Sequence, residues 1–408
     1  MSASVSRAAR VAAWGLFGLT AGHAEKRPAP AAAASVAPPP AAAKAAAASG
    51  PTTAAAAKPA GAGVSCLPQR RVDLVKLITE QPLARGSNRG MNRGASKDLD
   101  LNQDRGPGPN PDARSGQFVA VSRGAPRWLA GFNLALAWEN DDCKAFSEFA
   151  AQMGYEAIEV TDAPTGEHHY VLLEKAGRHN GLFVFRAPAE RGSARALTIT
   201  APHVGFDFRD ARGIRLYREV KAVAYLQNTA ERCSSEDCSG CTAFASYACG
   251  GCPRQSDAAH SVDHLLFAVY AGLEAVRKDV RFEYHGAGPH AALPGCRASA
   301  HLSQGATRML TPQEDQGTAA SLFWQALEQR LGAQCVCYHQ RERGCQLPGA
   351  ASVFGRLTNE EPTTPFDPCG QPTARISGRF VHFEWFQVPP EDIAAALAAA
   401  VPLPRPGG

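Results

Sequence analysis

Strands and helices alternate along the chain from about residue 156 to residue 401, and this alternation constrains the fold more than any other feature. β-rich apolar runs lie at 156–161, 169–174, 181–186, 197–201, 222–226, 280–284 and 379–386. Amphipathic helical patterns lie at 145–153, 214–219, 261–277, 318–331 and 391–401. This order favours a mixed, largely parallel sheet with helices on both faces. We therefore predict a three-layer α/β/α fold, in which the runs at 169–174 and 181–186 form a hairpin.

The first 65 residues are expected to lie outside this fold. Residues 1–24 have the three parts of a secretory signal peptide: basic Arg7 and Arg10, a short apolar run, and small residues ending at Ala24. In residues 25–65 about half of the positions are alanine and most others are small or proline, which is typical of a disordered linker. The remaining residues, 66–408, are predicted to form a single catalytic-type α/β domain, with 85–116 as a mobile loop.

The 12 cysteines all lie beyond the predicted linker. An even number in an exported chain favours disulfides, which would staple the loops of the fold. The strongest spacing signal is the cluster at 233–252, which contains two C-x-x-C pairs, Cys238 with Cys241 and Cys249 with Cys252. That spacing also suits a structural zinc ion or a thiol–disulfide function, and the sequence leaves the pairing open.

Charge and apolar length limit the partners of the chain. The formal net charge of +4 falls when Arg7 and Arg10 leave with the signal, so no strong field remains to attract nucleic acid. Nothing beyond the signal approaches the about 20 apolar residues that a transmembrane helix needs. We expect an extracytoplasmic protein, periplasmic or secreted, with no transmembrane segment and no nucleic-acid partner.

Polar residues with metal-ligating chemistry stand at the ends of two predicted strands. His203 follows the run at 197–201, and Asp207 lies four residues further on, past a glycine that lets the chain turn back. His285 follows the run at 280–284, and strand alternation places it on the face opposite Tyr284. Two imidazoles and one carboxylate with an open position for water are the usual form of a catalytic zinc site.

A third strand, at 379–386, carries a carboxylate. Glu384 points away from Val381, Phe383 and Trp385, on a strand otherwise apolar enough to lie inside the protein. A buried carboxylate is costly unless it is paired or used. Beside a zinc-bound water, Glu384 can take the proton as general base and pass it to a leaving amine.

The order of these motifs resembles the zinc-carboxypeptidase-like hydrolases. Within that group it resembles most the N-formylglutamate amidohydrolases and phage poly-γ-glutamate hydrolases, where a Pro-His-Gly-type turn and a His-Gly strand end carry the metal. The resemblance covers about 197–386 and implies a phosphorylase/hydrolase-like α/β/α fold, one Zn²⁺ ion and hydrolysis of an amide bond. It would make His203, Asp207 and His285 the ligands and Glu384 the base. The carboxypeptidase pattern has a glutamate three residues after the first histidine, so Asp210 stays an alternative to Asp207.

Four further residues are expected to contact or orient a substrate. Arg356 and Asn359 lie in a turn-rich stretch, where such hydrolases often hold a substrate carboxylate and where arginine offers a bidentate fork. Asp257, His260 and His264 have the spacing of one helix face, but no glutamate follows His260, so the metalloprotease helix motif is absent. We expect Asp257 and His260 near the mouth of the pocket and a structural role for His264.

These features together predict an exported zinc metallohydrolase that cleaves C–N bonds of a small peptide or amide substrate. γ-Glutamyl and cell-wall peptides are the natural candidates for a peptidase or amidohydrolase of this kind. The alternative is a cysteine-rich secreted binding or envelope-associated protein that keeps the fold without activity, which the linker also fits. Metal content distinguishes the two. A thiol–disulfide function of the C-x-x-C pairs is a third option.

Overall fold

The computed structural model describes residues 66–81, 125–175, 177–203, 211–235, 237–239, 241, 252–342, 345, 349–360, 368–369 and 375–404. All of them belong to one compact unit, Ser65–Gly408. The predicted signal peptide, linker and loop at 85–116 lie outside the described residues, as do Asp207 and Asp210.

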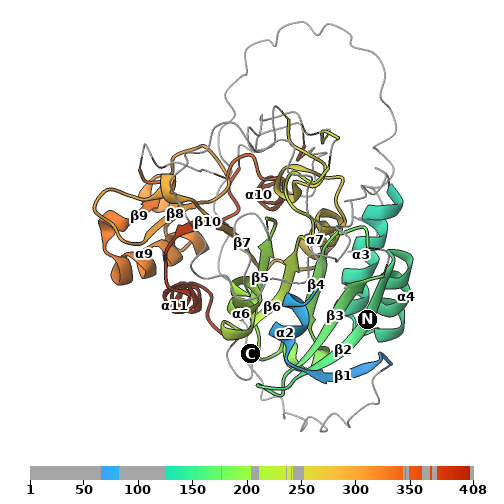
Figure 1. Cartoon of the computed structure of the whole chain (residues 1–408). Coiled ribbons are helices and arrows are strands. Elements are labelled where there is room, and N and C mark those ends of the chain that lie inside the picture. The colour runs from blue at the N-terminus through green and yellow to red at the C-terminus, as the bar shows by residue number, and fades with distance from the viewer. Residues whose placement is uncertain are drawn as a thin grey trace, which may run out of the picture. The chain divides into compact units, whose positions relative to one another are not determined.

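One sheet of ten strands runs through the described residues in the order β1-β2-β3-β4-β6-β5-β7-β10-β8-β9 (Figure 1). Its strands are β1 Gln69–Val72, β2 Tyr155–Asp162, β3 His168–Glu174, β4 Leu182–Arg186, β5 Arg195–Ala201, β6 Ala222–Gln227, β7 Val280–Gly286, β8 Ser299–Ser303, β9 Val336–Tyr338 and β10 Phe380–Phe386. Strands β6, β5, β7 and β10 are neighbours and run parallel, while β3, β4 and β8 pair antiparallel to their neighbours nearer the centre. The predicted mixed sheet and the hairpin β3–β4 are confirmed.

Helices cover both faces of this sheet, which confirms the three-layer prediction. One core cluster joins the sheet to α2 Leu74–Thr79, α6 Arg212–Glu219, α9 Ala319–Leu331 and α11 Pro390–Ala400. The other joins its opposite face to α3 Ala125–Glu139, α4 Cys143–Gln152, α7 Leu265–Val276 and α10 Val353–Asn359. Short helices α5 Pro188–Arg191 and α8 Pro312–Asp315 lie in connections. Among the helices of the described residues, not one combines the length and the apolar character that crossing a bilayer requires.

Helix α3 is absent from the sequence-based prediction, because apolar residues lie on several of its sides and no clear period stands out. It packs along α7, and the two backbones meet at a pair of glycines. A Cβ on Gly131 would overlap the carbonyl oxygen of Ala268, and a Cβ on Gly272 would overlap that of Gly131. The close approach of these helices therefore requires glycine at both positions.

Other differences from the prediction concern short or capped elements. The stretch around Arg356, predicted to be turn-rich, is helix α10, whose first turn is capped by Ser352 through the backbone nitrogen of Gly355. Helix α7 begins four residues later than predicted, because His264 caps it by accepting from the backbone nitrogen of Leu266. Strands β8 and β9 were not predicted.

Disulfides join distant loops, as the cysteine count predicts. The described pairs are Cys66–Cys143, Cys238–Cys252, Cys241–Cys369, Cys296–Cys335 and Cys337–Cys345, and Cys233 is also disulfide-bonded. Since Cys238 pairs with Cys252 and Cys241 with Cys369, the two C-x-x-C motifs do not provide four thiolates for one metal ion. The structural-zinc alternative for this cluster is therefore wrong.

A buried histidine on β3 makes the stability of the fold sensitive to acid. His169 is fully buried, and its Nδ1 lies 2.9 Å from the hydroxyl of Tyr217. Burial, and then the charge of Arg186 on the neighbouring strand, lower the pKa of His169 from 6.5 to about 3. Between pH 6.5 and about pH 3, His169 is protonated in the unfolded chain but stays neutral in the folded chain. The stability contributed by neutral His169 is therefore complete above pH 6.5 and is lost as the pH falls.

We expect His169→Gln to flatten this acid dependence. Between pH 6.5 and pH 4.5 the free energy of unfolding of the wild type should fall more steeply than that of the variant, by up to about 1.4 kcal/mol per pH unit. Urea unfolding at several pH values measures the difference. The control is His168→Gln, because the His168 side chain is 43% exposed. If the His169→Gln profile ran parallel to that of the wild type, the assignment would be wrong.

Candidate metal centre

Polar side chains gather on one face of the central strands, where an apolar core would be expected. Along β7, Phe282 packs in the first core, whereas Glu283 and His285 face the other way. On β10, His382 and Glu384 share that second face. The register of the parallel pair places His382 beside Glu283 and Glu384 beside His285.

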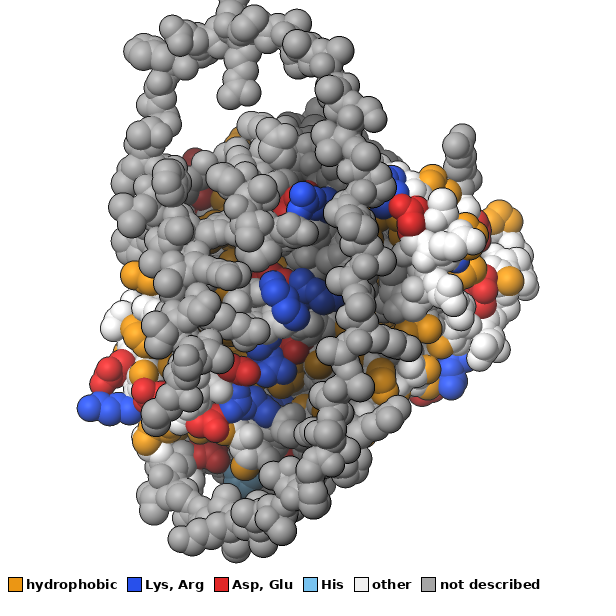
Figure 2. Space-filling model, turned by 180° about the vertical axis from the view of Figure 1, so that it is seen from behind, with side chains coloured by type: hydrophobic (Ala, Val, Ile, Leu, Met, Phe, Trp, Pro, Cys, Tyr) orange, Lys and Arg blue, Asp and Glu red, His pale blue; other side chains and the backbone are white. Residues whose placement is uncertain are grey.

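The two histidines predicted from separate motifs meet at this point. His203 follows β5, which pairs directly with β7, and its ring centroid lies 4.8 Å from that of His285. The rings are 2% and 3% exposed. Figure 2, which draws one face of the molecule, shows little histidine surface among the described side chains. Parallel strands end at the same edge of a sheet, which explains why residues far apart in sequence converge.

Asp257 holds the first of these histidines from the side. Its Oδ1 lies 2.8 Å from Nε2 of His203 and 3.0 Å from Nδ1 of His260, and its Oδ2 accepts from Nε of Arg232 at 2.9 Å. Burial alone would raise the pKa of Asp257, but His260, His203 and Arg232 outweigh burial and hold it well below its usual value. Asp257 precedes the short 3₁₀ helix Ala258–His260 rather than lying on α7.

Glu283 lies against the second histidine. Its Oε1 lies 3.1 Å from Nε2 of His285, at ion-pair distance, and its Oε2 lies 3.3 Å from Nδ1 of His382 in a hydrogen bond. Burial opposes ionisation of Glu283, yet the two neighbouring imidazoles of His285 and His382 hold its pKa far below the usual value. Nε2 of His382 then lies 3.2 Å from Oε1 of Glu384. Burial disfavours the charged imidazole of His382, but Glu283 and Glu384 raise its pKa above 6.5.

These contacts assign a role to some of the imidazole nitrogens. An ionised carboxylate only accepts hydrogen bonds, so Nε2 carries the proton in His203. Nδ1 is then the nitrogen with which the His203 ring would bind a metal ion. The contact between Nε2 of His285 and Glu283 is an ion-pair distance without hydrogen-bond geometry, so it does not assign the nitrogens of that ring. His382 is a poor ligand by the same argument, because each of its nitrogens faces a carboxylate.

The residues present fit a zinc ion. Imidazole nitrogen and carboxylate oxygen are its usual ligands, and an additional carboxylate commonly holds the far nitrogen of each ligating histidine. The structure contains two separate groups whose ligand atoms lie within 4.8 Å of one another, His203 with Asp257 and His260, and Glu283 with His285 and His382; the predicted pair of His203 and His285 takes one residue from each group.

Sequence-based reasoning named His285 and Glu384 but missed Glu283 and His382. The signal was available, because each missed residue lies two positions before a named one and therefore on the same face of its strand. Arg232, which orients Asp257, follows strand β6 in a loop that carries no comparable signal.

Arg356 and Asn359 on α10 hold backbone segments in place. The guanidinium of Arg356 donates to the carbonyls of Ala350 and Pro368, both at 3.0 Å. Asn359 donates to the carbonyl of Gln304 at 2.6 Å and accepts from the backbone nitrogen of Ser377 at 3.0 Å. Their assignment to substrate binding stays a prediction.

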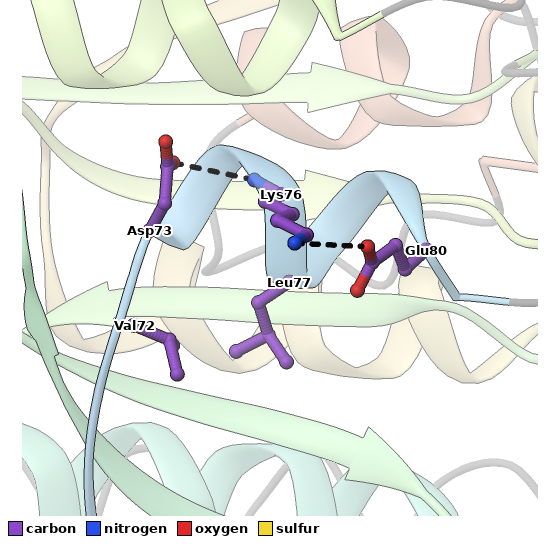
Figure 3. A pocket seen from close by; sticks show the side chains of 5 residues that line it. All are labelled: Val72, Asp73, Lys76, Leu77 and Glu80. Carbon is purple, nitrogen blue, oxygen red and sulfur yellow. Dashed lines mark hydrogen bonds and ion pairs between the residues drawn. The ribbon is translucent and has the colours of Figure 1, made fainter.

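A surface pocket beside α2 lies apart from these groups and has different chemistry. Val72, Asp73, Lys76, Leu77 and Glu80 line it (Figure 3). Its charged side chains are already used, since Asp73 caps α2 and Lys76 lies 3.8 Å from Glu80. It contains no imidazole or thiol, so the histidine-rich face of β7 and β10 is the stronger candidate.

Comparison with known proteins adds little to this geometry. No family model matches the chain, and no curated protein matches it. A solved structure from Shewanella denitrificans OS217, described as "a putative metallopeptidase", is similar at 11% sequence identity. The match covers 64% of this chain and 88% of that one, with a TM-score of 0.25. A similarity this low carries no argument, so the function has to be argued from the site.

Proposed function

We propose that the protein is a zinc-dependent hydrolase of amide bonds. His203 and His285 would bind zinc, and a carboxylate from the segment after His203, Asp207 or in its place Asp210, would complete the ligand set. The observation that supports this most is the pair of buried imidazoles at the ends of neighbouring parallel strands, each with its Nε2 against a buried carboxylate. Carboxylate–histidine pairs of this kind orient metal ligands and raise their basicity.

In this proposal Glu384 is the general base. When bound, zinc polarises a carbonyl group and lowers the pKa of a bound water to about 7. A carboxylate oxygen of Glu384 takes a proton from the attacking water and later gives it to the leaving nitrogen as the C–N bond breaks. Glu384 is then a carboxylate again. The register of β10 on β7 supports this role, because it places Glu384 directly beside His285.

The substrate class follows from the proposed chemistry and the location from the disulfides. We propose a small peptide, γ-glutamyl or cell-wall peptide substrate, consistent with the expected amide-bond chemistry. We also propose an extracytoplasmic location, because disulfides form and persist in oxidising compartments.

Metal analysis of the purified chain from about Val64 onward tests the proposal. We expect about one zinc ion per chain, and almost complete loss in the His203→Ala/His285→Ala double variant, since three protein ligands are the usual minimum of a catalytic site. The His168→Gln/His169→Gln double variant removes two histidines from β3 and should keep its zinc. Zinc that persists in the His203→Ala/His285→Ala variant would place the metal elsewhere. Wild-type protein without zinc, even after reconstitution, would favour the binding-protein alternative.

A further inference from the structure

Four side chains form a compact block on the face that β7 and β10 share: the buried Glu283, His285 and His382 and the partly buried Glu384. The parallel register sets them in two rows, Glu283 beside His382 and His285 beside Glu384. The rings of His285 and His382 are 4.7 Å apart. Contacts run around the block from His285 to Glu283, on to His382 and finally to Glu384, at 3.1, 3.3 and 3.2 Å.

Glu283 connects the two histidines of this block. It is 1% exposed, and each of its two oxygens faces a different imidazole. Taking a carboxylate out of water is costly unless both oxygens find partners. Here both partners belong to the proposed site, one to the metal side and one to the base side.

The ring of His382 has a partner at each nitrogen and a close neighbour on one side. Both of its nitrogens face carboxylates, and one side of its ring packs against Gly349. A Cβ on Gly349 would overlap the His382 ring, and the backbone φ of +61° there also favours glycine. Gly349 leaves room for the ring on this side, and the ring in turn lies against the carboxylate of Glu384.

We propose that Glu283 and His382 are positioning residues that couple the metal ligand His285 to the base Glu384. Glu283 fixes the ring of His285 with one oxygen and the ring of His382 with the other, and His382 fixes the carboxylate of Glu384. The ligand and the base are thereby held at a set separation by one carboxylate. This inference rests on the proposed function.

The coupling predicts different effects for the two residues. Glu283→Gln should weaken zinc binding about 10–100-fold, because outer partners of ligating histidines contribute that much to metal affinity. It should also lower kcat. His382→Gln should leave zinc affinity within about threefold while kcat falls about 100-fold at nearly constant KM, because only the base is misplaced. Glu283→Asp keeps the charge, but its side chain is one methylene shorter and reaches only one of the two imidazoles. Compared with Glu283→Gln, it should therefore restore either the zinc affinity or kcat, but not both.

Competition for zinc with a chromophoric chelator measures the affinity, and hydrolysis of γ-glutamyl and peptidyl p-nitroanilides measures kcat and KM. His169→Gln, a buried histidine on β3, is the matched control and should match the wild type in both. If Glu283→Gln kept wild-type zinc affinity, or if His382→Gln lost zinc as readily as Glu283→Gln, the coupling would be refuted while the hydrolase proposal stood. A wild type that binds no zinc would refute both.

Discussion

Replacing Glu384 by glutamine should lower kcat about 10²–10⁴-fold, which is the usual contribution of a positioned general base. Glutamine has almost the same shape, and its carbonyl oxygen can still accept from Nε2 of His382, so the site should keep its geometry. What it cannot do is accept the proton of the attacking water and return it to the leaving nitrogen. The measurement is the rate of p-nitroaniline release by zinc-loaded wild type and variant.

The zinc content of the Glu384→Gln variant decides how a loss of activity is interpreted. Zinc should remain at the wild-type level, since Glu384 is not a proposed ligand. Glu391→Gln, on an exposed side chain at the start of α11, removes a carboxylate without touching the site and should be fully active. Wild-type turnover in zinc-loaded Glu384→Gln would show that this residue is not the base.

Arg281→Met should cost the fold about 1–3 kcal/mol, the usual cost of leaving a buried polar group without its hydrogen-bond partner. Arg281 lies two residues before Glu283 on the same face of β7 and is fully buried. Its Nε donates to Glu274 at 3.0 Å, and its Nη1 donates to the hydroxyl of Thr198 at 2.6 Å. Without it, Glu274 keeps Arg379 and Lys278 as partners, so the loss comes from the two buried hydrogen bonds to Glu274 and Thr198.

The free energy of unfolding in urea measures this effect. The matched control is Arg330→Met, because Arg330 lies 3.1 Å from Asp392 in a pair whose side chains are 42% and 23% exposed. Such surface pairs are worth at most about 1 kcal/mol. Equal losses in the two variants would mean that the buried network beneath the candidate metal centre does not stabilise the fold as argued here.

The elements that the sequence predicted correctly are those whose pattern of apolar residues shows which face is buried. Strand β10 is mostly apolar, and β5 and β7 alternate apolar with polar residues in a strand period, while helices α9 and α11 have a single apolar stripe. Helix α3 was not predicted, because α4 and α7 both cover it and it has no polar side against which a helical apolar period would stand out. Strand β8 was missed because it is short and offers only two apolar residues, Ala300 and Leu302, between three polar ones.

The candidate site was predicted where a side chain stood out against its strand and missed where it did not. His203 and His285 follow apolar runs, and Glu384 interrupts one. Glu283 and His382 interrupt the same runs, but a strand shows only which residues share a face, not which of them will bond across to a neighbour. That pairing depends on the register of β7 with β10, strands separated by nearly a hundred residues of intervening chain.

The place of β10 in the sheet also determines which of the proposed catalytic residues can come together without it. This late strand inserts between β7 and β8, and its pairing with β7 spans more sequence than any other strand pairing of the described residues. His203 and His285 need no help from it, because β5 pairs directly with β7. The two proposed histidine ligands can therefore come together without β10, whereas Glu384 reaches the site only when that strand pairs. A chain in which β10 is unpaired would lack its proposed base and would be unable to hydrolyse the peptides around it.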